Sequence, residues 1–97
     1  MTRIIIESPK KQAIQPIIQA ALATEAQKLE LSLKRTREKL KSFEDHYRIN
    51  TGQFIERMTA GDLSGGDLEY VEWVGEFRLL QKIEADLAIL RDIDYAD

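Results

Sequence analysis

Residues 26–47 read AQKLELSLKRTREKLKSFEDHY and place an apolar or small side chain at alternating three- and four-residue steps. This spacing puts those side chains on one side of a long α-helix. A second stripe of the same kind runs from residue 70 to residue 93. Because each stripe needs a cover, the sequence predicts two long helices that pack together. The members of the first stripe are Ala26, Leu29, Leu33, Thr36, Leu40, Phe43 and Tyr47.

The composition describes one small domain. With 97 residues, the core of a single chain is only marginally sufficient. The absence of cysteine excludes disulfides, thiolate metal sites and thiol catalysis. The apolar run near the N-terminus is three isoleucines long, too short for a signal peptide or a membrane span. We therefore expect a cytoplasmic protein that does not interact with membranes.

The net charge of −3 is distributed unevenly. Residues 1–66 carry eleven Lys and Arg against eight Asp and Glu, whereas residues 67–97 carry three against nine. In a hairpin the basic helix would lie beside the acidic one, and much of the charge would be satisfied within the molecule. An exposed ion pair is worth only about 0.2–1 kcal/mol, so the asymmetry favours pairing and orientation more than stability.

Two prolines determine where the first helix is expected to begin. Residues 3–7 form a short β-branched run, which predicts an extended segment because Pro9 disfavours helix in the residue before it. Pro16 would cost roughly 3 kcal/mol in a helix interior. We therefore expect a short turn at residues 10–15 and a main helix from near Pro16 to about Ile49. A longer, kinked helix is the alternative.

A short break separates the two long helices. Asn50 suits the left-handed conformation that ends a helix, and Thr51 suits the start of a new one. We expect a short helix at residues 53–60, a glycine-rich loop at 61–66 and a last helix at 67–92. The residues after that helix should fray.

The two long helices differ in expected length. At about 1.5 Å per residue they span roughly 50 Å and 40 Å, so the last helix covers about the final two dozen residues of the first. Residues before about Ala21 are then without cover, which divides the chain into an arm at 1–21 and a hairpin at 22–97. Burying each large apolar side chain is worth about 1.5–3 kcal/mol, so the arm predicts an interaction site. Its candidate contacts are Ile4, Ile5, Ile6, Ile14, Ile17, Ile18 and Leu22.

Aromatic residues gather near the predicted turn. Trp73 and its neighbours at the start of the last helix face those at the end of the first. Core packing is one interpretation. Tyrosine and tryptophan are also enriched at interface hot spots, and the two roles are compatible in a dimer. The candidate partner or dimer contacts in this group are Tyr47, Phe54, Tyr70 and Trp73.

The sequence offers no set of residues that predicts catalysis. His46 is the only histidine and cannot supply a transition-metal shell by itself. The loop from Asp62 fails the EF-hand pattern, because Asp67 and Trp73 stand where glycine and glutamate are needed. No phosphate-binding glycine motif is present. We therefore predict no catalytic residue, no metal site, no cofactor and no enzyme activity.

Nucleic-acid binding is disfavoured as well. The basic residues between 34 and 41 spread around most of the solvent side of their helix, and Glu38 interrupts them. If the arm formed a DNA-reading strand, one alternating face would include Glu7 and the other would be mostly isoleucine. A DNA-binding regulator stays open only as a third hypothesis.

The stretch from Tyr47 to Trp73 resembles a widespread group of small, mostly uncharacterised prokaryotic proteins. Its pattern is a tyrosine ending a basic helix, a Ser or Thr cap, a short helix with Phe and Arg, a Gly-x-Leu loop and a helix start like D-x-x-Y/F-x-E-W. A glycine often follows the tyrosine in that group, where this chain has Arg48. The resemblance covers roughly residues 28–93 and leaves the arm unmatched. The matching residues are Tyr47, Thr51, Phe54, Arg57, Gly61, Leu63, Asp67, Tyr70, Glu72 and Trp73.

Members of this group are commonly encoded beside a candidate toxin, so the resemblance implies the antitoxin half of a toxin–antitoxin module. We predict an all-α long helical hairpin with a short helix at the turn and a short extended N-terminal arm, dimerising into a four-helix bundle. The predicted function is a non-enzymatic protein–protein interaction module that binds and neutralises a cognate toxin. A structural self-association module, in the form of a dimeric coiled coil, is the alternative. The expected partners are a second copy of the chain and the toxin.

Overall fold

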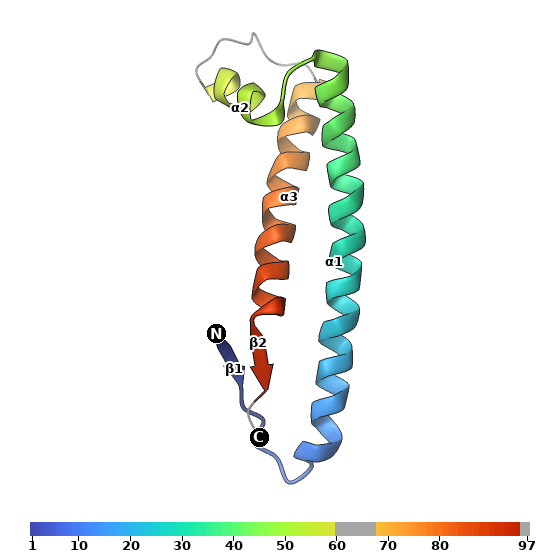
Figure 1. Ribbon diagram of the computed structural model, residues 1–97, viewed down its shortest axis with the longest axis vertical. Helices are drawn as coiled ribbons and strands as arrows, with labels where there is room; N and C mark the ends of the chain where they lie inside the picture. Colours follow the sequence, from blue (N-terminus) through green and yellow to red (C-terminus); the bar gives the residue numbers. More distant parts are fainter. Residues whose placement is uncertain (60–67, 96–97) are drawn as a thin grey trace.

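The computed structural model describes residues 1–59 and 68–95 and forms a rod of 61 × 22 × 18 Å (Figure 1). The predicted all-α hairpin with a short helix at its turn is confirmed. The predicted loop at 61–66 and the predicted start of the last helix at Asp67 lie outside the described residues. The elements are β1 (Thr2–Ile4), α1 (Lys11–Tyr47), α2 (Thr51–Thr59), α3 (Leu68–Arg91) and β2 (Ile93–Tyr95).

The first helix is longer than expected. α1 begins at Lys11 and continues through Pro16, so the prediction of a start near Pro16 is wrong. Pro16 lies in the second turn, where its missing N–H removes a single bond, to the carbonyl of Gln12. The first turn is held from outside the helix, since the Lys11 N–H donates to the Ser8 carbonyl at 3.2 Å. A proline this close to the helix start therefore leaves the helix continuous.

α1 packs against α3 along the hairpin. Leu40 of α1 is buried, as are Ile83 and Leu87 of α3. Among the described residues, three ion pairs cross between the helices. In two of them a basic residue of α1 meets an acid of α3, as the charge distribution predicted, and in the third the polarity is reversed. They join Arg37 to Glu84 at 3.8 Å, Lys39 to Glu76 at 3.2 Å and Arg91 to Glu30 at 3.1 Å.

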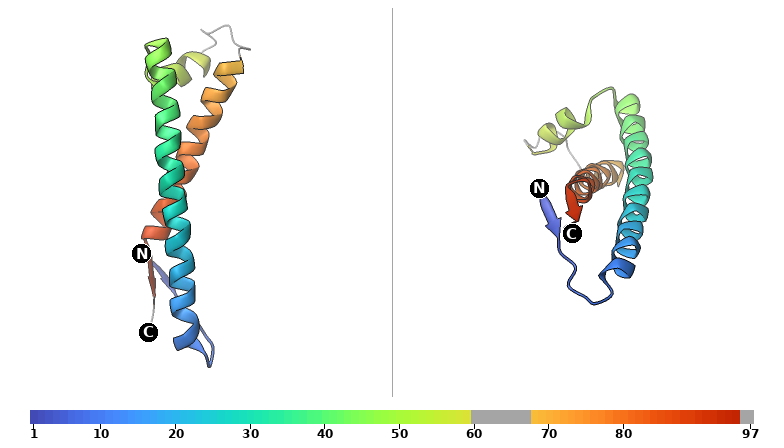
Figure 2. Two further views of the ribbon diagram at one scale, coloured as in Figure 1. Left: turned by 90° about the vertical axis from the view of Figure 1, so that its right-hand side faces the viewer. Right: turned by 60° about the horizontal axis from the view of Figure 1, so that its bottom comes forward.

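The core at the turn end is aromatic. α1 and α3 diverge there, and α2 packs over them (Figure 2). Trp73 is 0% exposed and Phe54 is 1% exposed, and their rings stack with centroids 3.8 Å apart. Phe43 and Tyr47 of α1 stack on Trp73 at 5.3 and 5.6 Å. All three helices therefore meet at one indole ring.

Two hydrogen bonds fix α2 to both long helices. The Trp73 Nε1–H donates to the Thr51 Oγ1 at 3.0 Å in a buried position. The Thr51 N–H donates to the Glu44 Oε2 at 2.7 Å. Thr51 thus links the indole of α3 to the last turn of α1, and the polar groups that this core encloses are paired.

The turn residues differ from expectation in their roles. Arg48, and not Asn50, takes the left-handed conformation that ends α1, with φ 55°. The Asn50 Oδ1 accepts the Gln53 N–H at 2.8 Å, so Asn50 caps the start of α2. α2 consequently begins at Thr51, before the predicted residue 53.

The two ends of the chain pair with each other. β1 and β2 form a parallel two-stranded sheet in the register Thr2↔Ile93 and Ile4↔Tyr95 (Figure 1). The expectation that the residues after α3 fray is therefore wrong for Asp94 and Tyr95, and the arm has a partner within its own chain. β2 prolongs the path of α3 along α1 and so supplies part of the cover that the shorter helix lacks. A sheet this small is marginally stable by itself.

Replacing Thr51 with valine should lower the free energy of unfolding by about 1–3 kcal/mol, because the buried Trp73 N–H loses its acceptor. Each kcal/mol corresponds to about 4–8 °C in Tm for a domain of this size, so thermal denaturation followed by circular dichroism measures the effect. Thr59→Val is the matched control, since the Thr59 hydroxyl donates to the Ile55 carbonyl of its own helix at an exposed position. Equal Tm values for Thr51→Val and the unchanged chain would contradict the role of Thr51.

Arg48→Gly should raise the free energy of unfolding by about 0.5–1 kcal/mol, because glycine adopts the left-handed conformation without the steric cost of a Cβ. Chemical denaturation provides the measurement. Arg48→Ala keeps the Cβ and should give no comparable gain. If glycine and alanine had the same effect, the conformation of Arg48 would not be the cause.

Candidate interaction surfaces

The apolar residues of the arm gather at the end of the rod opposite the turn, where both strands and the start of α1 lie (Figure 1). Ile5 and Ile17 are 67% and 68% exposed. Leu22 lies in a groove with Ile93 and Tyr95 of β2. The structure therefore covers part of the predicted arm surface and leaves part exposed. The half-buried members are Ile4, Ile6, Ile14, Ile18 and Leu22.

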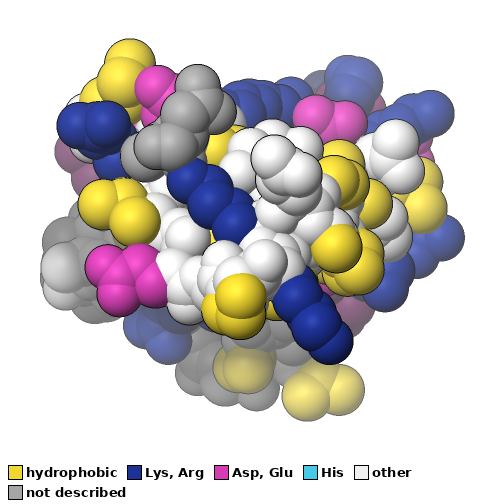
Figure 3. Space-filling model, turned by 90° about the horizontal axis from the view of Figure 1, so that it is seen from below, with side chains coloured by type: hydrophobic (Ala, Val, Ile, Leu, Met, Phe, Trp, Pro, Cys, Tyr) yellow, Lys and Arg dark blue, Asp and Glu magenta, His cyan; other side chains and the backbone are white. Residues whose placement is uncertain are grey.

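This end of the rod, the base, combines apolar and basic side chains. Seen from below, its hydrophobic side chains form separate small patches with Lys and Arg between them (Figure 3). Each strand of the sheet has one neighbour among the described residues, which leaves one edge of each strand open. Open strand edges present backbone donors and acceptors that a further strand can pair with.

The four aromatic candidates lie at the opposite end of the molecule from the isoleucines. Trp73 and Phe54 belong to the core, in agreement with the core-packing interpretation of the sequence. Tyr47 and Tyr70 are half-buried, with their rings edge to face at 5.6 Å. The Tyr47 hydroxyl donates to Glu69. The structure therefore does not combine the aromatic and the isoleucine candidates into one surface.

A second apolar surface, not predicted from the sequence, runs along one flank of α3. Leu79 and Ile89 of this flank also line grooves together with residues of α1. Its large hydrophobic members are Leu68, Val71, Leu79 and Ile89, which are 80%, 62%, 45% and 59% exposed. Gly75, Lys82 and Asp86 fill the three- and four-residue steps between them, so apolar periodicity alone does not reveal this surface. We call this surface the outer stripe; it comprises Leu68, Val71, Gly75, Leu79, Lys82, Asp86 and Ile89.

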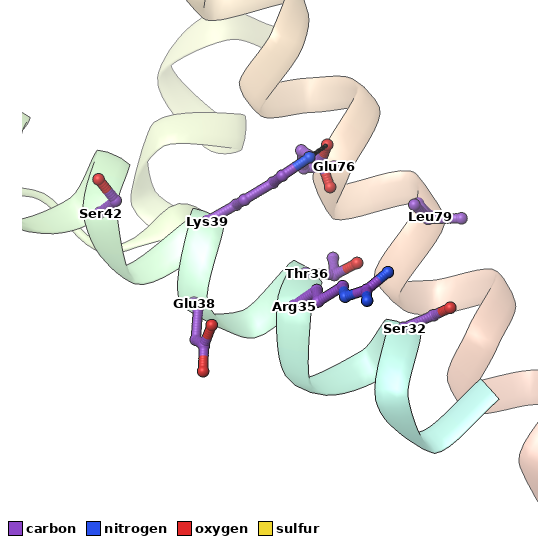
Figure 4. Close-up of a pocket in the computed structure, with 8 residues that line it drawn as sticks. All are labelled: Ser32, Arg35, Thr36, Glu38, Lys39, Ser42, Glu76 and Leu79. Atoms are coloured by element: carbon purple, nitrogen blue, oxygen red, sulfur yellow. Dashed lines mark hydrogen bonds and ion pairs between the residues drawn. The ribbon is translucent and has the colours of Figure 1, made fainter. Parts of the chain in front are cut away.

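A shallow groove between α1 and α3 borders the outer stripe (Figure 4). Its α1 wall carries mostly small or polar side chains, and Thr36 is only 3% exposed. Lys39 crosses the groove to Glu76 at 3.2 Å, and Leu79 belongs to both the groove and the outer stripe. Arg35 lines the same groove and has no ion-pair partner among the described residues.

The residues considered for metal binding and catalysis lie apart in the described part of the chain. Within residues 1–59 and 68–95, no three His, Cys, Asp or Glu side chains come together to form a metal site. His46 is exposed, and its ring meets the Tyr47 ring edge to face at 4.6 Å. The loop considered for calcium or phosphate falls mostly outside the described residues. None of the described helices has both the length and the apolar character needed to span a bilayer.

Comparisons of the chain with protein-family models, with curated proteins and with solved structures found no match. The two exposed apolar surfaces, at the base and along α3, are the candidate sites of interaction.

Removing residues 1–7 should leave the helical hairpin folded, because the core cluster around Leu40, Phe54 and Trp73 lies away from β1. Circular dichroism should still show a helical chain with a cooperative thermal transition. Hydrogen exchange should become faster in Ile93–Tyr95, which lose their strand partner, and stay unchanged around Ile83. Loss of cooperative unfolding in the shortened chain would show that the arm is part of the core.

Proposed function

We propose that this chain is a non-enzymatic protein–protein interaction module that dimerises into a four-helix bundle. In an antitoxin-like role, it covers a cognate toxin protein with the base of the rod. The observation that carries the proposal is the exposure of Ile5 and Ile17, at 67% and 68%, beside a sheet with open edges.

The geometry of the base suits a protein partner. Ile17 projects from a continuous helix, whereas Ile5 follows a strand that pairs at only three positions. A strand of the partner that joins an open edge would gain backbone hydrogen bonds, and the isoleucines would supply apolar contacts. Burying each isoleucine fully is worth about 1.5–3 kcal/mol, enough together to matter for affinity.

Charge indicates what kind of partner surface fits. Arg3, Lys10 and Lys11 lie at the base together with two acids, Glu7 of the arm and Asp94, which is the register partner of Arg3. Basic side chains flank the hydrophobic patches in the view of this end (Figure 3). A partner with an apolar surface and a rim of both charges would therefore be complementary.

The toxin assignment comes from the resemblance of residues 47–73 to proteins encoded beside candidate toxins. The alternative, a structural self-association module, uses the same base differently, with the open strand edges pairing between two copies. The two hypotheses differ in whether a foreign protein is needed to cover Ile5 and Ile17.

The test is calorimetric titration of the full chain with the purified product of the neighbouring gene. Ile5→Lys combined with Ile17→Lys should weaken binding by about tenfold or more, because central apolar contacts carry about 2 kcal/mol each at hot spots. Leu31→Lys is the matched control, since Leu31 is also an exposed apolar residue of α1, at 51%, but lies away from the base.

In cells, co-expression of the unchanged chain should relieve growth arrest caused by the neighbouring gene product, and the double lysine variant should not. Absence of binding would contradict the toxin role. Equal affinities of the double variant and the Leu31→Lys control would contradict the base as the contact surface.

A further inference from the structure

We propose that the outer stripe of α3 is the interface between two copies of this chain, packed antiparallel about a two-fold axis near Leu79. This inference rests on the dimer part of the proposed function and specifies its geometry. It does not depend on toxin binding, which uses the base of the rod.

The outer stripe contributes no buried residue to the core of a single chain. The inner face of α3 already supplies the core, with Trp73, Ile83 and Leu87 buried. Four further large hydrophobic side chains nevertheless follow the outer side, from Leu68 to Ile89. A helix that is apolar on a flank as well as on its buried face is typical of one packed between two neighbours, and α1 is only one of them.

Gly75 lies in the middle of the outer stripe. A Cβ added at this position would meet nothing within 4 Å. The packing of the single chain therefore does not require glycine, although glycine is a poorer helix former than alanine. A glycine on an exposed helix face allows another helix or a long side chain to approach closely.

The outer stripe is also self-complementary. In a two-fold interface, a residue that contacts a second position is contacted by that same position in return. With the axis near Leu79, Leu68 of one copy lies opposite Ile89 of the other, Gly75 lies opposite Lys82, and Val71 lies opposite Asp86. Lys82, the one basic residue of the stripe, thus meets Gly75, which has no side chain. The Lys82 stem therefore has room to lie across the second helix.

The charges along the outer stripe also favour a second copy of the chain as the partner that covers it. Glu72 is exposed one turn before Gly75 and has no ion-pair partner among the described residues, which is also true of Arg35 in the adjoining groove. Lys82 pairs with Asp86 of its own helix at 3.4 Å, and the antiparallel arrangement also brings it near Glu72 of the other copy. It also sets the second copy's α3 alongside α1, with Glu72 near Arg35. A parallel arrangement would instead place Glu69, Glu72 and Glu76 in register with themselves.

Light scattering coupled to size-exclusion chromatography of the full chain tests the interface. The unchanged chain should be a dimer that dissociates on dilution. Gly75→Gln should raise the dimer dissociation constant about tenfold or more, because the new side chain holds the helices apart. It should not lower helicity, since that side chain has open space in the monomer. Ala20→Gln, at an exposed site on α1 outside the stripe, is the matched control and should leave the dimer unchanged.

Charge reversal gives a second, independent readout. Glu72→Lys should also weaken the dimer by roughly tenfold, because it faces Lys82 and Arg35 of the other copy. Adding Lys82→Glu and Arg35→Glu to that variant should restore most of the affinity. A dimer that Gly75→Gln and Glu72→Lys leave intact would overturn this interface while the dimer itself stands. A monomer at every concentration would overturn both, and neither result bears on the titration with the toxin candidate.

Discussion

α3 carries large apolar side chains on its buried face and along one flank, and α1 leaves most of that flank exposed. Its inner side, with Trp73 and Leu87, packs against α1 and α2 and forms the core. Its outer side exposes Leu79 and Ile89 along the length of the rod. The hydrophobic effect makes exposure of such a surface unfavourable, so the outer stripe is a candidate contact surface.

The two ends of the hairpin differ in how firmly they are held. At the turn, Trp73 stacks with aromatic rings from two helices and donates to Thr51, so the end of each helix is tied to the others. At the base, two three-residue strands pair without a third strand among the described residues. A rigid end and a marginally stable end suit a protein that keeps one surface constant and adapts the other to a partner.

The periodicity of residues 26–47 was enough to predict α1 and its packing side, because long helices of strong helix formers follow their apolar spacing. The start of α1 was misplaced because the cost of proline depends on the turn before it, which Ser8 and Lys10 hold. The pairing of β1 with β2 could not be predicted, since it joins opposite chain ends and depends on the lengths of the intervening helices. The outer stripe was overlooked because Trp73 and its neighbours already explained the apolar content of α3. Whether the isoleucines at the base contact a toxin stays a prediction.

The most direct test of a second copy on the outer side of α3 uses the absence of cysteine from the natural chain. A single cysteine placed by Leu79→Cys lies near the proposed two-fold axis, where the two thiols come within disulfide reach. Mild oxidation should link that variant into a dimer at low protein concentration, and should leave Leu31→Cys largely unlinked. Equal cross-linking of the two variants, or none at position 79 in a chain that is otherwise folded, would contradict the account.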